Sequence, residues 1–205
     1  MLFRSKIYLS HYLSDLVESN NLRIVPLGGF KQVRRVYSYL VAPLSDKEAG
    51  AKGKVLCVVD TDAQKEHIEL SKEVKNLFFK RLVRDEIKLE VVVVDADSQF
   101  SFPTEIEFAL HEEVFNKLLN FPELCKTLTN FSVLQDIVNG TTVVNGSNNL
   151  YDYLNLGPKE MKRIMDNFFD VDHNKVAFAK AYIASDSEKV FEPKWIETIR
   201  TLFKA

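Results

Sequence analysis

Two aspartates separated by one residue follow a short apolar run. The run Val55–Val59 is typical of a buried strand in a parallel sheet. Asp60 and Asp62 fall at or just past its carboxyl end, where open α/β sheets place their ligands. Because side chains two apart on a strand point the same way, both carboxylates can converge on one Mg²⁺ or Mn²⁺. The simpler alternative is that Asp62 caps the following helix and Asp60 is a solvated strand end.

Further acids follow in the next segments of the chain. A second apolar strand over 89–94 ends in Asp95 and Asp97. If the two strands are parallel neighbours, their carboxylates crowd together, which is unfavourable without a cation. We therefore expect Asp95 to lie nearest the site and Asp97 to serve as a loop or cap residue. Glu105 and Glu107 come about ten residues later, and Glu107 fits a further metal ligand. Both glutamates also fit the acidic first turn of a solvated helix.

Two basic features could hold a phosphate. Lys31, Arg34 and Arg35 follow a Gly-Gly pair and could contact nucleic-acid phosphates, although a solvated helix face is the simpler explanation of these residues taken alone. Lys175 opens an apolar helix, where an ammonium group could stabilise negative charge developing on a phosphate. A surface lysine is the alternative there.

The charges are segregated along the chain. The formal net charge is −2, but residues 1–59 carry nine Lys and Arg against four Asp and Glu. Residues 60–113 carry seven against fourteen. This pattern suits a site where carboxylates hold metal and basic groups hold a polyanion. On charge alone, segregated solvated helix faces remain the simpler explanation.

The composition is that of a globular protein. The chain has 205 residues, of which 46% are hydrophobic and 27% charged, enough for one sizeable domain. No apolar stretch reaches the length of a membrane span, and the start lacks the features of a signal peptide. We expect a cytoplasmic protein with no membrane partner. Its four histidines are scattered and its two cysteines are far apart, which argues against zinc.

The periodicity predicts an α/β fold. Helices and strands alternate up to residue 100, including a short strand over 22–27 and a long helix over 64–84. Such alternation predicts a small parallel sheet with right-handed crossovers, flanked by helices. The pattern then becomes mainly helical, with one short strand over 141–144. We therefore predict an α/β core over 1–100 and a helical subdomain over 101–205 packed on it.

The order of these parts resembles a Toprim domain. A helix, the segment Arg-Ile-Val-Pro-Leu-Gly-Gly at 23–29, a second helix and then Leu-Cys-Val-Val-Asp-Thr-Asp at 56–62 carry the likeness. More narrowly, the chain resembles the Toprim nucleases of the OLD family and related phage-defence proteins. Glu107 stands where those proteins often place a further acid. Lys175, in Lys-Val-Ala-Phe-Ala, is similar to a lysine near their C-terminus.

The resemblance implies a metal-dependent nuclease. Two Mg²⁺ or Mn²⁺ ions would be held by Asp60, Asp62, Asp95 and Glu107, and would activate water and stabilise the leaving oxygen of a phosphodiester. Glu107 and Lys175 would act in catalysis. The implied partners are DNA, an ATPase or another protein, and a second copy of the chain, in a phage-defence or DNA-repair system.

One part of the Toprim pattern is absent. Toprim domains begin with a strand that carries Glu-Gly, whereas no acid precedes Asp15 here. Either the chain is a fragment that begins after this motif, or the domain has lost it. The missing glutamate favours a second hypothesis, a degenerate Toprim-like module that acts as a protein-interaction or regulatory partner. A third hypothesis is an unrelated doubly wound domain of the receiver or nucleotide-binding kind.

Overall fold

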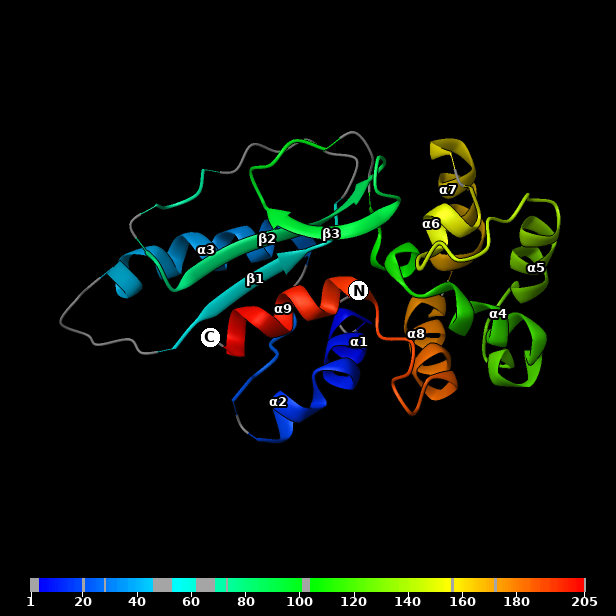
Figure 1. Cartoon of the computed structure of the whole chain (residues 1–205), viewed down its shortest axis with the longest axis horizontal. Coiled ribbons are helices and arrows are strands. Elements are labelled where there is room, and N and C mark those ends of the chain that lie inside the picture. The colour runs from blue at the N-terminus through cyan, green and yellow to red at the C-terminus, as the bar shows by residue number, and fades with distance from the viewer. Residues whose placement is uncertain are drawn as a thin grey trace.

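The computed structural model describes residues 4–19, 21–27, 29–45, 53–61, 69–72, 74–100, 104–155, 157–171 and 173–204. A three-stranded sheet with flanking helices lies beside a group of helices from the second half of the chain (Figure 1). The strands are β1 (Val55–Val59), β2 (Leu77–Asp85) and β3 (Glu90–Asp95). The α-helices are α1 (Arg4–Tyr12), α2 (Ser14–Glu18), α3 (Gly29–Ser45), α4 (Glu112–Asn120), α5 (Phe131–Asn139), α6 (Leu150–Tyr153), α7 (Pro158–Ile164), α8 (Asn174–Ser185) and α9 (Lys194–Lys204). Shorter helical turns are η1 (Ile106–Ala109), η2 (Pro122–Cys125) and η3 (Met165–Phe169).

The sheet is mixed rather than parallel. Its order is β1-β2-β3, with β1 parallel to β2 and β3 antiparallel to β2. The expected α/β class is confirmed at this level, but the all-parallel sheet was wrong. The short turn after Asp85 explains the difference, because a connection of a few residues allows only an antiparallel return.

Residues 77–85 form a strand where the sequence predicted the end of a long helix. Their burial alternates at first, with Leu77, Phe79 and Arg81 buried and the residues between them less so. β-branched and aromatic residues in this stretch favour a pleated surface over a helix. Two other predicted strands are also wrong: residues 22–27 and 141–144 belong to no sheet. Both are short segments that lack a partner strand within the described chain.

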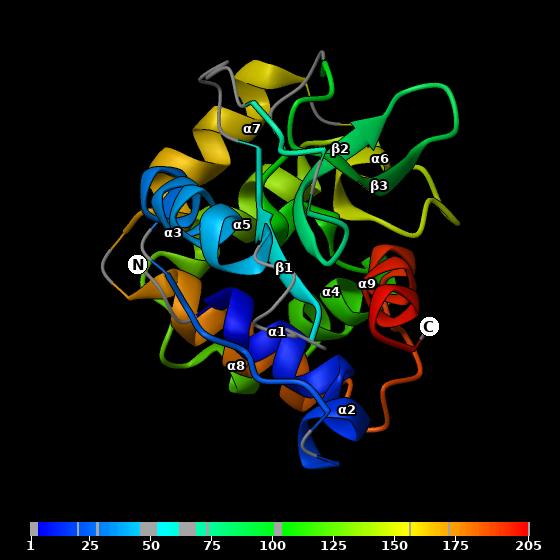
Figure 2. The ribbon, with the colours of Figure 1, turned by 90° about the vertical axis from the view of Figure 1, so that its left-hand side faces the viewer.

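Helices cover both faces of the sheet. α3 and α9 lie on opposite sides of it in two perpendicular views (Figures 1 and 2). Cys57 and Val59 point toward α3 and pack with Val33 and Tyr37. Leu56 and Val58 alternate to the other face and pack against the main core. Asp60 follows Val58 by two residues, so the same alternation directs its side chain toward the main core.

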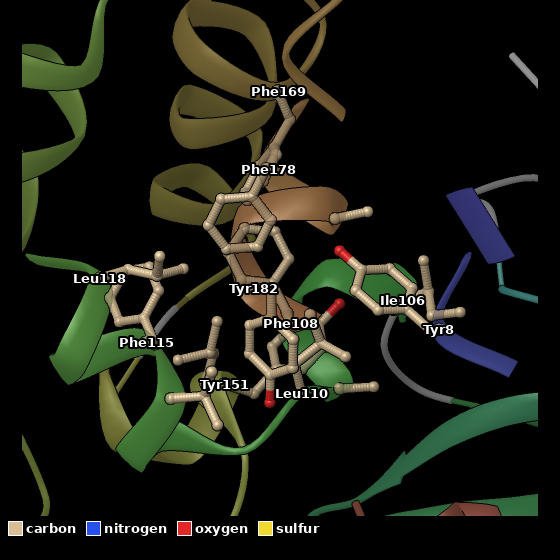
Figure 3. Packing of buried hydrophobic residues seen from close by; sticks show 14 of the residues in the cluster. Tyr8, Ile106, Phe108, Leu110, Phe115, Leu118, Tyr151, Phe169, Phe178 and Tyr182 are labelled. Atoms are coloured by element: carbon tan, nitrogen blue, oxygen red, sulfur yellow. The ribbon is translucent and has the colours of Figure 1, made fainter. Parts of the chain in front are cut away.

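The main core joins the two halves of the chain. It gathers Tyr8 and Tyr12 of α1, Leu82 of β2 and the buried residues of the later helices. Figure 3 shows Tyr8 and Ile106 at one side of this cluster, with Phe178 and Tyr182 of α8 in it. The domain division at residue 100 stays a prediction. No helix among the described residues has the length and apolar character needed to cross a membrane.

Candidate carboxylate site

Three carboxylates converge on one arginine. Arg4 Nη2 donates a hydrogen bond to Asp60 Oδ2 at 2.6 Å and lies 3.3 Å from Glu105 Oε2. Arg4 Nη1 lies 3.2 Å from Glu107 Oε1. We call Arg4, Asp60, Glu105 and Glu107 the Arg4 cluster. It brings together residues up to 103 positions apart, since Arg4 opens α1 and Glu107 lies in η1.

A two-residue bridge places the glutamates beside the aspartate. The backbones of Thr61 and Thr104 exchange two hydrogen bonds of 2.9 Å in an antiparallel bridge. The hydroxyl of Thr61 donates to the carbonyl of Leu82, and the hydroxyl of Thr104 accepts from the amide of Arg84. Because both threonines are held against β2, Glu105 is fixed next to Asp60. The helical turn η1 then carries Glu107 into the interior.

The first two turns of α1 supply the arginine and a tyrosine. Arg4, Tyr8 and Tyr12 are four residues apart and share one face of α1. Tyr8 is fully buried, and its ring meets that of Tyr182 on α8 edge to face at 5.8 Å. The hydroxyl of Tyr12 donates to Asp186 at 2.9 Å. These contacts fix α1 against α8 and so hold Arg4 at the carboxylates.

Lys175 lies close enough to act on the cluster electrostatically. Its ammonium pairs with Asp170 at 2.5 Å, and its charge partly opposes the rise that burial causes in the pKa values of Glu105 and Glu107. The preceding residue, Asn174, is buried and bonds the backbones of Thr129 and Phe168 through its side-chain amide. This amide fixes the start of α8 and thereby the position of Lys175.

Burial and mutual repulsion perturb the ionisation of the acids. Burial, with the charges of Asp60 and Glu107, raises the pKa of Glu105 to about 8. Burial also raises the pKa of Glu107, whose side chain is 0% exposed, and Arg4 opposes that rise. Burial alone would lower the pKa of Arg4, but the three carboxylates raise it above its ordinary value. Burial and mutual repulsion therefore keep Glu105 and Glu107 from ionising as readily as free carboxyls, despite the nearby guanidinium.

Several polar atoms in the cluster and beside it have no hydrogen bond from the described chain. They are Arg4 Nη1, both carboxylate oxygens of Glu107 and the hydroxyl of Tyr8. Burial and the charge of Glu107 raise the pKa of Tyr8 well above its ordinary value, so the hydroxyl stays neutral. Buried polar groups are normally hydrogen-bonded, and a group of unsatisfied atoms in one place is typical of a functional site.

The donor chemistry of the cluster fits a hard divalent cation. Carboxylate oxygens are the ligands that Mg²⁺ and Mn²⁺ prefer, and Asp60, Glu105 and Glu107 supply them from two segments. As they stand, however, the acids surround Arg4. Across the described residues, no three acidic, histidine or cysteine side chains are arranged to hold a metal ion directly.

The structure brings together only part of the predicted site. Asp60 and Glu107 lie in the cluster, and Lys175 lies near it. Asp62 lies outside the described residues. Asp95 does not join the site. It ends the edge strand β3, its side chain is 56% exposed, and it pairs with Lys80 of β2 at 2.8 Å. The prediction for Asp95 was wrong because it assumed that its strand runs parallel beside β1, whereas β2 separates the two.

The predicted phosphate contacts lie on the surface of α3. Lys31, Arg34 and Arg35 are exposed, on the side of the helix away from Val33 and Tyr37. α3 begins at the end of the sheet where β1 finishes (Figure 1). These cations therefore stand near the same end of the sheet as Asp60, but they do not belong to the cluster.

Sequence reasoning missed Arg4 and Tyr8 as members of the site. The only signal for them is the four-residue spacing of Arg4, Tyr8 and Tyr12, which places a charge at the end of an apolar helix face. Glu105 was noticed with Glu107 but was not selected as a ligand.

Comparison with known proteins adds no relative. No protein-family model matches the chain, and neither a curated protein nor a solved structure matches it.

Proposed function

We propose that this chain is a Toprim-like domain that acts on the phosphodiester bonds of nucleic acid with a divalent cation held at the Arg4 cluster. The observation that supports the proposal is that Asp60, Glu105 and Glu107 gather around Arg4 at the carboxyl end of β1. Open α/β sheets bind their ligands at this end. Toprim membership is itself part of the proposal and rests on the sequence resemblance.

Each residue has a defined role in this proposal. Asp60, Glu105 and Glu107 hold the cation, which would activate water and neutralise charge on the scissile phosphate. Lys175, 14% exposed beside the acids, contacts the phosphate. Glu107→Gln should weaken cation binding, because an amide lacks the charge that retains the cation. DNA is the proposed nucleic acid, and the exposed cations of α3 are its proposed backbone contacts.

A cleavage assay tests the proposal. Supercoiled plasmid is incubated with the protein and Mn²⁺ or Mg²⁺, and Asp60→Ala is compared with Asp95→Ala. We expect cation-dependent nicking by the wild type and by Asp95→Ala, and none by Asp60→Ala. Asp95 is the matched control because it is an aspartate at a strand end outside the cluster. Absence of both cleavage and a cation-dependent rise in Tm across the full cation titration would contradict the proposal.

One observation favours the alternative, a degenerate module that serves as a regulatory or interaction partner. Arg4 already contacts all three carboxylates, so the cluster is partly neutralised without a cation. Under this alternative Arg4 is a permanent structural replacement for the metal. A Tm that is insensitive to cations in both the wild type and an Arg4 variant would support it.

A further inference from the structure

We infer that Arg4 and the divalent cation compete for the same place, so that Arg4 must leave the carboxylates before the cation binds. The inference rests on the proposed function and adds the regulation of that same site. In this conformation the site is closed by the chain's own side chain.

The geometry makes occupation by both cations unfavourable. The two terminal nitrogens of Arg4 lie within 2.6–3.3 Å of oxygens of Asp60, Glu105 and Glu107. Mg²⁺ binds oxygen at about 2.1 Å, so an ion shared by these carboxylates would stand where the guanidinium now lies. Two positive centres in one buried place would also repel each other strongly.

The arginine fits this place incompletely. Arg4 Nη1 faces Glu107 Oε1 at 3.2 Å, but neither atom makes a hydrogen bond within the described chain. The second oxygen of Glu107 and the buried hydroxyl of Tyr8 are also unsatisfied. An arginine built only for stability would be expected to satisfy these groups. The unsatisfied, fully buried carboxylate indicates that its best partner is a group other than Arg4.

The position of Arg4 on α1 allows it to leave. It is the first residue of the helix, whereas Tyr8 and Tyr12 hold the following turns against α8. Rotation of the Arg4 side chain therefore does not require these anchors to break.

Mn²⁺ binding tests the competition. Calorimetric affinities for Mn²⁺ alone are compared among the wild type, Arg4→Gln and Arg200→Gln. Arg200 is the matched control, because it also contacts three carboxylates and has the same side-chain exposure of 12%. We expect Arg4→Gln to bind Mn²⁺ at least about tenfold more tightly than the wild type, since it removes the competing charge. Arg200→Gln should bind like the wild type, and adding Asp60→Asn to Arg4→Gln should abolish the gain.

The outcomes separate this inference from the proposed function. Equal Mn²⁺ affinity in the wild type and Arg4→Gln, with loss in Asp60→Asn, would overturn the competition and leave the cation site intact. Absence of Mn²⁺ binding in every variant would overturn both.

A second measurement follows Arg4 in the wild-type protein itself. Wild-type protein with ¹⁵N-labelled arginine is titrated with Mg²⁺, and the Arg4 side-chain signal is assigned by its loss in Arg4→Lys. We expect the signal to move toward that of a solvent-exposed arginine as Mg²⁺ binds. An Arg4 signal that stays unchanged while Mg²⁺ raises the Tm would overturn the inference, even if Arg4→Gln does not fold.

Discussion

Two arginines of this protein each contact three carboxylates, but in different surroundings. Arg200 pairs with Asp15, Glu192 and Glu197, of which Asp15 and Glu197 are 57% and 61% exposed. Arg4 pairs with acids that are 23%, 16% and 0% exposed. Arg200 also donates to the backbone carbonyl of Tyr12 at 2.7 Å, so it links α9 to α1.

The ionisation of the acids shows what the two clusters do. The hydrogen bond from Arg200 lowers the pKa of Asp15, while burial raises that of Glu192. In the Arg4 cluster, burial raises the pKa values of both Glu105 and Glu107 despite the guanidinium. Arg200 and its three acidic partners therefore form a largely solvent-exposed ion-pair network that links α9 to α1. In the Arg4 cluster, burial keeps the two glutamates from ionising as readily as free carboxyls, and the single arginine only partly offsets this effect.

Replacing Arg4 should lower the free energy of unfolding more than replacing Arg200. We expect Arg4→Gln to lower the free energy of unfolding by about 3 kcal/mol at pH 7 in metal-free buffer, because buried acids lose their counter-charge. Arg200→Gln should cost about 1 kcal/mol, since its partners are mostly solvated. Chemical denaturation measures both values. Mn²⁺ should restore stability to Arg4→Gln and not to Arg200→Gln; equal restoration would remove the distinction between the clusters.

The pH dependence of stability should report Glu105. Its pKa is about 8 in the folded state and near 4.5 when unfolded, so the folded state holds the extra proton between these values. Stability from this group is complete below pH 4.5 and is lost as the pH rises toward 8. We expect a decline of about 2 kcal/mol between pH 5 and pH 7, and a flatter curve in Glu105→Gln. Glu197→Gln is the control, and an identical slope in the two variants would refute the assignment.

Two tyrosines on one face of α1 provide a smaller test. The hydroxyl of Tyr12 donates to Asp186, whereas that of Tyr8 has no hydrogen bond within the described chain. Tyr12→Phe should cost about 1 kcal/mol, because the buried carboxylate of Asp186 loses its hydroxyl donor and keeps only the longer bonds from the Phe191 amide. Tyr8→Phe should be neutral or slightly stabilising. Thermal unfolding of both variants checks this, and a larger loss in Tyr8→Phe would mean that its hydroxyl is already satisfied.

The smallest effect is expected at Asp95. Its pair with Lys80 is exposed, so Asp95→Asn should change the free energy of unfolding by less than about 0.5 kcal/mol. Its Mn²⁺ affinity, measured in the Arg4→Gln background, should equal that of Arg4→Gln alone. A marked fall in affinity would place Asp95 in the site and contradict the arrangement described above.

Part of the fold and of the Arg4 cluster was predictable from the sequence. The run Val55–Val59 was long and apolar enough to identify a buried strand, and the strand is present with Asp60 directly after it. Glu107 was also expected near Asp60, and it is. The strand prediction depended on a local apolar pattern, whereas Glu107 was placed near Asp60 from its position in the chain and from the family resemblance.

The rest depended on long-range pairing. Arg4 reaches Asp60 across 56 positions, and no local pattern specifies that contact. The strand order placed β2 between β1 and β3, so Asp95 lies two strands away from β1 and outside the cluster. The apolar pattern of residues 77–85 is compatible with both a helix and a strand, and packing in the sheet favours the strand.

The most direct test of the cation site is crystallographic. Crystals of Arg4→Gln in saturating Mn²⁺ should give an anomalous scattering peak between the carboxylates of Asp60, Glu105 and Glu107. Wild-type crystals under the same conditions should show either that peak with Arg4 turned away or Arg4 in place with no peak. Absence of a peak among these carboxylates in Arg4→Gln, or a peak beside an undisplaced Arg4 in the wild type, would contradict the account.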